Sequence, residues 1–209
     1  TLVVHDGSQA GGTPLMRESG GGVNATINGV NIGKGTNSVE NNTALGAFAL
    51  DASVTGNFNT AVGAIALTDL TSGQQNTAVG YNAGANITTA NFNTFIGSTA
   101  GANITTGGNN TAIGQSALPQ CTTGSNNTVV GRNAMPLLTD GTTNTGVGSQ
   151  VFASLTTGDG NVAIGYAAGD AITTADNNTC VGTASLGSCT TGTGTVALGI
   201  NSLNSATTA

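Results

Sequence analysis

Hydrophobic and polar positions follow one pattern that returns every seventeen residues along most of the chain. In each repeat an aliphatic residue is followed by a glycine, and the spacing of these glycines never changes. A fixed period of this length is typical of a solenoid, in which each repeat is one coil that packs only against its neighbours. The pattern therefore predicts a rod. Its turn glycines are Gly46, Gly63, Gly80, Gly97, Gly114, Gly131, Gly148, Gly165, Gly182 and Gly199.

Residue types within the repeat favour strands and turns over helices. Glycine and β-branched residues oppose helix formation, and the helical period of 3.6 residues is absent. Seventeen residues have room for two short strands and two turns. The predicted fold is an all-β parallel β-solenoid, or β-roll, of 17-residue coils. Coils this thin are marginal alone, so we expect an elongated homotrimer.

The residue directly before each turn glycine is Leu, Val or Ile in every repeat. Branched aliphatic side chains favour strands and pack in columns when coils stack. We therefore interpret this aliphatic column as the core of the rod. Its central members are Val62, Val79, Ile96, Ile113, Val130, Val147, Ile164 and Val181.

An asparagine stands four positions before the turn glycine in nine of ten repeats, and Thr195 takes its place in the last. Stacked asparagine side chains can hydrogen-bond along a column and satisfy polar groups at a turn. We predict an asparagine ladder with a structural role, formed by Asn59, Asn76, Asn93, Asn110, Asn127, Asn144, Asn161 and Asn178.

Side-chain size varies at one apolar position, four residues after the turn glycine. Most repeats hold a large residue there, such as Leu67 or Leu118, but three hold Gly84, Gly101 or Gly169. An isoleucine follows three positions later in those three repeats, and we expect it to restore part of the missing volume. Each coil then closes with Thr-Thr-Gly or a variant, whose glycine is predicted to adopt a positive φ.

Composition excludes several functions. Only 6% of residues are charged, where ordinary globular domains have about 25%. Three Lys or Arg residues and a net charge of −6 give no basic surface for nucleic acid. No apolar run reaches the ~20 residues of a membrane-spanning helix. We therefore expect no enzyme activity, no cofactor, no nucleic-acid partner and no membrane insertion.

Four segments follow one another along the chain. Residues 1–18 are predicted to end a small β module, 19–23 to form a glycine-rich joint, and 24–45 to form an irregular capping coil. The regular solenoid is predicted for 46–209 and is expected to continue beyond the sequence. The first coil is set apart because Gly33 precedes Gly46 by thirteen residues instead of seventeen.

Two segments carry a resemblance to known proteins. One is LVVHDGSQAGGTPLMRE, which resembles the closing strands of a module of phage tail-fibre and receptor-binding proteins related to the major tropism determinant N-terminal domain. The other is ATINGVNIGKGTNSVENNTALG with the NTAVG repeats that follow, which resembles the shafts of phage tail fibres. The repeats are also similar in architecture to the heads of trimeric autotransporter adhesins.

The resemblance implies a structural protein of a phage tail fibre, located in the virion and extracellular. It would form a rigid trimeric shaft that displays receptor-binding regions, with other tail proteins and a host-surface glycan or protein as partners. One alternative is a bacterial surface adhesin of the trimeric autotransporter type. Another is an ice-binding or polysaccharide-binding solenoid, suggested by the threonine column of Thr88, Thr105, Thr122 and Thr139.

A few side chains invite other interpretations. Asp159 and Asp176 occupy the same position in adjacent coils, so their carboxylates are expected roughly 5 Å apart. That spacing suits a retaining glycosidase or a shared cation, but a solvated turn explains it more simply.

Aromatic and thiol side chains are the remaining candidates. Two aromatic pairs recur at shared positions and could stack on a sugar, although core or intersubunit packing is favoured. The three cysteines are interpreted as small apolar residues. No catalytic, cofactor-binding or metal residues are predicted. These aromatic residues and cysteines are Tyr81, Tyr166, Phe58, Phe92, Cys121, Cys180 and Cys189.

Overall fold

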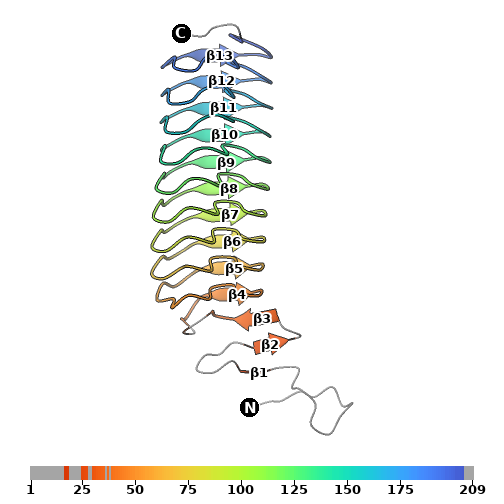
Figure 1. The fold of residues 1–209 in the computed structure, drawn as a ribbon, viewed down its shortest axis with the longest axis vertical. Coiled ribbons are helices and arrows are strands. Elements are labelled where there is room, and N and C mark those ends of the chain that lie inside the picture. The colour runs from red at the N-terminus through yellow and green to blue at the C-terminus, as the bar shows by residue number, and fades with distance from the viewer. Residues whose placement is uncertain (1–16, 19–24, 28–29, 36, 38, 205–209) are drawn as a thin grey trace.

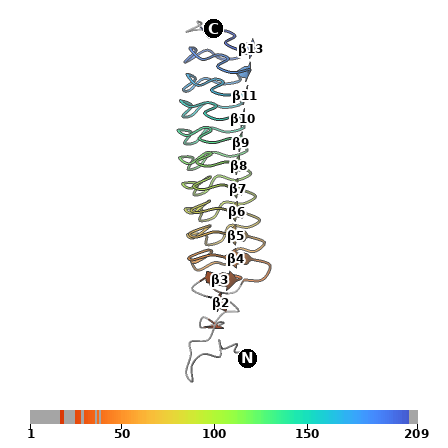
Figure 2. The same ribbon diagram turned by 90° about the vertical axis from the view of Figure 1, so that its right-hand side faces the viewer.

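A computed structural model describes residues 17–18, 25–27, 30–35, 37 and 39–204 of the chain. They form one sheet of thirteen short strands that follow one another in chain order. Figure 1 shows the coils stacked into a long rod, and Figure 2 shows the strands along one side of it. The predicted all-β parallel solenoid is therefore confirmed. Residues 1–16 and 19–23, to which we assigned a β module and a joint, lie outside the described residues.

Ten strands form the regular stack, and each pairs with the next in parallel at an offset of seventeen residues. Thr60 lies opposite Thr77, for example, and Ala61 opposite Ala78. The strands are β4 (Thr43–Leu45), β5 (Thr60–Val62), β6 (Thr77–Val79), β7 (Thr94–Ile96), β8 (Thr111–Ile113), β9 (Thr128–Val130), β10 (Thr145–Val147), β11 (Val162–Ile164), β12 (Thr179–Val181) and β13 (Val196–Leu198).

An antiparallel segment precedes this stack. Strands β1 (Arg17–Glu18), β2 (Ala25–Ile27) and β3 (Val30–Gly33) pair antiparallel, and so do β3 and β4. The sequence between β2 and β3 is Asn-Gly, the dipeptide most typical of a two-residue hairpin. The cap that we expected as an irregular coil over 24–45 thus contains antiparallel strands, and the regular register already begins at Thr43.

Each regular coil contains one strand of three residues, not the two strands expected. Turns make up the rest, and their amides still donate to the next coil, as from Leu67 N to Ala83 O (3.1 Å) and Asp69 N to Ala85 O (3.0 Å). Four positions per coil have a positive φ, including non-glycine residues such as Ile65 (63°). These left-handed residues interrupt any second strand, because a strand needs extended backbone.

The interior is built from the middle residue of each strand and from the turns, not from the predicted aliphatic column. Ala61 is fully buried, whereas Ile96 and Ile164 are 40% and 44% exposed on the outer side of the sheet. Strand side chains alternate between faces, so a buried middle residue forces both neighbours outward. The core assignment was therefore wrong for the whole column: Val62, Val79, Ile113, Val130 and Val181 are half-buried, and Ile96, Val147 and Ile164 are exposed.

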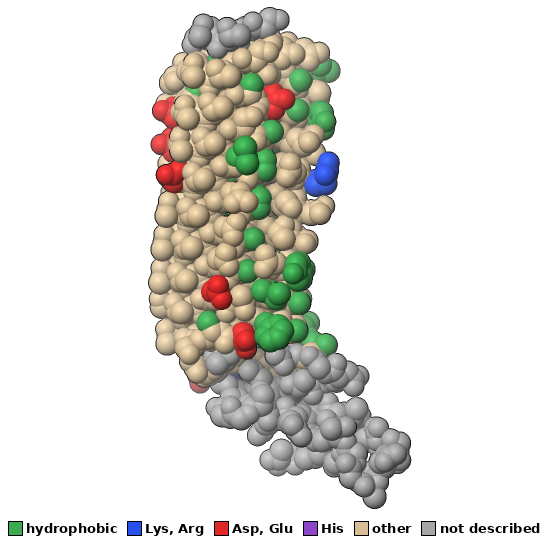
Figure 3. All heavy atoms as spheres, viewed as in Figure 1, with side chains coloured by type: hydrophobic (Ala, Val, Ile, Leu, Met, Phe, Trp, Pro, Cys, Tyr) green, Lys and Arg blue, Asp and Glu red, His purple; other side chains and the backbone are tan. Residues whose placement is uncertain are grey.

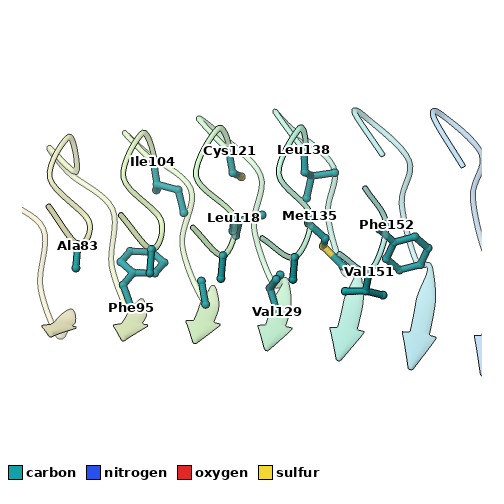
Figure 4. Packing of buried hydrophobic residues seen from close by; sticks show 14 of the residues in the cluster. Ala83, Phe95, Ile104, Leu118, Cys121, Val129, Met135, Leu138, Val151 and Phe152 are labelled. Atoms are coloured by element: carbon teal, nitrogen blue, oxygen red, sulfur yellow. The ribbon is translucent and has the colours of Figure 1, made fainter. Parts of the chain in front are cut away.

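Phenylalanine rings fill most of the space left by the small core residues. A Cβ added to Gly101 would lie 2.5 Å from the Phe95 ring, and one added to Gly169 would lie 2.7 Å from the Phe152 ring. Figure 4 shows both rings in the interior of the stack. The predicted compensation by isoleucine is a minor contribution at Gly84, where Ile87 Cδ1 would lie 3.3 Å from such a Cβ but the Phe95 ring would lie 2.9 Å from it.

Glycines let adjacent coils approach closely at the turn glycine of each repeat and at the closing glycine of most repeats. At the turn glycine Gly114, φ is +130° and an added Cβ would lie 2.5 Å from the carbonyl oxygen of Gly131. Gly124 in a Thr-Thr-Gly closure would meet the carbonyl oxygen of Gly141 at the same distance. Gly124 is not among the glycines with a positive φ. The closing glycine therefore suits this close approach and does not supply the φ that we expected, and Ala90 and Ala175 take its place in two coils.

Replacing Ser185 with alanine should stabilise the rod. Ser185 is fully buried, its Oγ has no hydrogen-bond partner, and most other coils hold alanine at this position. Removing an unsatisfied buried hydroxyl without leaving a cavity should raise the free energy of unfolding by about 1 kcal/mol. Chemical denaturation measures it. Ser125→Ala is the control of opposite sign, because Ser125 Oγ accepts a bond from Gly108 N (3.1 Å). A loss of stability in Ser185→Ala would contradict the prediction.

Candidate functional site

The asparagine ladder runs through the interior of the stack, and Asn127 shows its geometry. Its Nδ2 donates to Asn110 Oδ1 (3.1 Å) in the preceding coil and to Gly141 O (2.8 Å) in the following one. Its own Oδ1 accepts from the backbone amide (2.9 Å) and from Nδ2 (3.2 Å) of Asn144. One side chain therefore binds both neighbouring coils.

The ladder residues are buried from one end of the stack to the other. Asn59 to Asn178 are fully buried, and the ladder begins already at Asn42. It ends at Thr195, whose amide donates to Asn178 Oδ1 (2.9 Å) and whose own hydroxyl is buried without a partner. The structural role predicted for these residues agrees with this geometry, because buried amides that are hydrogen-bonded on both sides add stability and fix the register.

A second ladder uses the threonine column on which the ice-binding alternative was based. Thr88 Oγ1 donates to the carbonyl oxygen of Thr105 (3.2 Å), and Thr105 Oγ1 donates to that of Thr122 (3.1 Å). The same bond recurs from Thr71 to Thr173. These hydroxyls donate their hydrogen bonds to the next coil, so they are less available to bind water or ice.

The paired carboxylates stabilise turns. Asp159 Oδ1 accepts from Thr142 N (2.6 Å) and Thr142 Oγ1 (2.9 Å), and Asp176 Oδ1 accepts from Asp159 N (2.8 Å). Each carboxylate thus binds the turn of the preceding coil. The described part of the chain contains no group of three or more side chains arranged to hold a metal ion.

The three cysteines are part of the core. Cys121, Cys180 and Cys189 are free and fully buried. Burial raises the pKa of the Cys121 and Cys180 thiols to about 12, because the thiolate would lose its solvation. They pack as small apolar residues, as the sequence predicted.

The outer face of the sheet carries two columns along its whole length. The first residue of each strand is Thr in eight of the ten coils, and the third is the aliphatic column, with Leu45 at 39% and Leu198 at 66% exposed. Elsewhere the rod is largely uncharged, and Figure 3 shows only scattered charged side chains on the face in view. The sheet thus presents an uncharged, partly apolar strip that nothing in the described chain covers.

The aromatic pairs lie at the surface and not in the core. Phe58 and Phe92 are 54% and 55% exposed, and Tyr81 and Tyr166 are each 56% exposed. Packing of these rings inside the coil is therefore excluded, while packing between chains and contact with a sugar both stay open. The sequence pattern missed this exposure because shared repeat position alone does not say which side of a turn faces solvent.

The fold defines the chain as a parallel β-solenoid repeat protein. Comparisons with protein-family models, curated proteins and solved structures found no match. Within the described residues, no helix has the length and apolar character needed to cross a bilayer. The exposed columns and ladders are therefore the basis for any functional argument.

Converting one ladder asparagine to aspartate should strongly destabilise the rod. In Asn127→Asp, both Nδ2 donors are lost and a buried carboxylate faces two acceptor oxygens, which should lower the free energy of unfolding by at least about 3 kcal/mol at pH 7. Burial should raise the pKa of the new carboxyl, so stability should recover as pH falls toward 4. Denaturation at both pH values measures this.

The neighbouring Asn126→Asp is the matched control for the ladder variant. Asn126 is exposed, and its φ of 60° suits aspartate nearly as well as asparagine. We expect little change at either pH. Equal losses in the two variants would show that the ladder is not the cause.

Asp170 should make the stability of the stack depend on pH. Burial raises the pKa of its carboxyl above the ordinary value, and its Oδ1 is buried without a partner. Because the folded pKa exceeds the unfolded one, stability is greatest below the unfolded pKa and falls as pH rises through the folded pKa. Asp170→Asn should therefore raise the melting temperature more at pH 7 than at pH 3, measured by circular dichroism. An equal change at both pH values would contradict this.

Proposed function

We propose that the chain is a structural protein of a phage tail fibre, a shaft segment that associates as a parallel homotrimer. In this role it holds receptor-binding regions away from the particle during adsorption, with other tail proteins as partners. The proposal rests on the resemblance of the sequence and on two properties of the rod, its stiffness and its uncovered sheet face.

Stiffness is supported by the number of connections between neighbouring coils. Each pair of coils shares strand hydrogen bonds, turn hydrogen bonds, an asparagine bridge and, along most of the stack, a threonine bridge. These connections involve both the strand and the turns of each coil, so bending the rod would stretch some of them. Close packing of side chains in the interior and the short turns of each coil add to this resistance to bending.

The observation that carries the proposal is the aliphatic column on the outer face of the sheet. It continues through all ten coils, although a monomeric rod would be more soluble with polar residues there. A partner that contacts every coil in the same way must repeat at the same distance along its axis. A second copy of this chain, aligned in parallel, has that repeat distance because its coils are identical. Covering Ile96, Val147 and Ile164 would supply the apolar burial that a thin coil lacks.

An adhesin of the trimeric autotransporter type, the first alternative, would use the same rod and the same contact between chains. It would differ in needing a membrane anchor. No feature of the described residues favours it over a fibre shaft.

Native mass tests the proposal directly. We expect light scattering on the 209-residue chain to give three times the 20.1 kDa of one chain. Combining Ile96→Thr, Ile113→Thr and Val130→Thr should yield single chains, because threonine keeps the strand preference and removes apolar contact area.

Leu137→Asn is the control for that experiment. Leu137 is 49% exposed but lies outside the sheet, at a position where other coils hold asparagine. It should leave the mass unchanged, and circular dichroism should show intact coils in both variants. A single-chain mass for the unmodified protein would reject the trimer.

A further inference from the structure

We propose that a row of side chains at one corner of the rod, the Phe58–Gln75–Phe92 platform, binds a neutral linear polysaccharide of the β-1,4-linked type along the rod axis. The inference concerns a surface beside the sheet and goes beyond the proposed shaft role.

The three residues form a row because they occupy the same position in successive repeats. Phe58, Gln75 and Phe92 each stand five residues before a turn glycine, in three consecutive coils. The two rings are therefore two coil spacings apart, about 9.6 Å, and lie in line with the rod axis. Both are more than half exposed, so a large part of each side chain is accessible to a ligand.

Backbone conformation makes phenylalanine an unfavourable choice at these two positions. Both have a φ of 61°, in the left-handed region. Most other coils hold asparagine or glycine at the same position, among them Asn41, Asn109 and Asn126, while Gln75 and Thr143 share the conformation. An aromatic residue there costs about 1 kcal/mol in strain and exposes apolar area without any gain in core packing. Folding alone thus disfavours phenylalanine twice over, which points to a role outside the coil.

Polar neighbours complete the platform without introducing charge. Gln75 lies exposed between the rings, and its side chain makes no hydrogen bond within the described part of the chain. Gln74, beside it, is exposed as well, although its backbone amide is bound by Asn91 Oδ1 (2.7 Å). Amides that are free to donate and accept suit sugar hydroxyls. The absence of charged residues from this row favours a neutral ligand over an acidic one.

Ligand chemistry follows from the spacing. Aromatic rings stack on the apolar C–H face of a pyranose ring and shield it from water. In an extended β-1,4-linked chain, successive sugars turn over, so every second sugar presents the same face to one side. One sugar advances by about one coil, and the two phenylalanines would stack on alternate sugars. Gln75 would then meet the edge of the sugar between them.

Calorimetric titration with defined oligosaccharides tests the inference. The probes are cellohexaose, mannohexaose and chitohexaose, with cellobiose as a ligand too short for both rings and maltohexaose as one that curves. We expect at least one β-1,4-linked hexaose to bind, and more tightly than cellobiose or maltohexaose. Phe58→Asn and Phe92→Asn should each weaken it about tenfold, and the double variant should show no binding.

The asparagine variants keep the test interpretable, because asparagine is what other coils hold at this φ. Their melting temperatures should be equal to or above that of the parent. Tyr166→Thr is the matched control: Tyr166 is equally exposed in another column, and the next coil holds Thr183 there. It should leave the affinity unchanged.

Light scattering on the same samples separates this inference from the proposed trimer. Loss of glycan binding at unchanged mass supports the platform, whatever the number of chains. A fall in mass in Phe58→Asn/Phe92→Asn would assign the rings to contacts between chains and overturn the inference. Absence of binding by all three β-1,4-linked hexaoses, or binding that survives the double variant, would overturn it as well.

Discussion

Hydrogen bonding between equivalent residues of adjacent coils is the constraint on which the rest of this structure depends. Backbone amides, threonine hydroxyls and ladder asparagines all reach the residue seventeen positions away or its neighbour. Such bonds close only if every coil has the same length and the same path. This explains why the repeat contains no insertion from Thr43 onward: one extra residue would leave a buried asparagine and several amides without partners.

The short distance between coils in turn decides which residues are allowed. Glycines remain where backbones nearly touch, as at Gly114, and residues with left-handed backbone return at fixed places in each coil. The interior is too narrow for large residues in every coil, so volume is shared between neighbours. Gly101 leaves room for Phe95, and Gly169 leaves room for Phe152. The core is therefore specified across coils and not coil by coil.

A coil with so narrow an interior places many apolar side chains outside. The outer sheet face and the pair Phe58 and Phe92 are two of the surfaces that carry such side chains. The outer sheet face carries its apolar column in every coil, as a contact between identical rods would require. The phenylalanine pair is confined to two coils with one between them, as a discrete ligand would require. This difference in extent is why we assign the two surfaces different partners.

Sequence alone determined the period, the all-β solenoid class, the parallel register and the asparagine ladder, because each depends on residues compared at a fixed offset. The burial of the three cysteines was predictable for the same reason. Tertiary structure decided what faces inward. The aliphatic column was expected in the core and lies outside, since a three-residue strand has one inward position and Ala61 occupies it. The path of the turns also decided which glycines have a positive φ and which only allow close contact between coils. It decided as well which phenylalanines are buried. A repeat pattern states which residues are equivalent, but only the path of the coil in space states which side of the chain meets water.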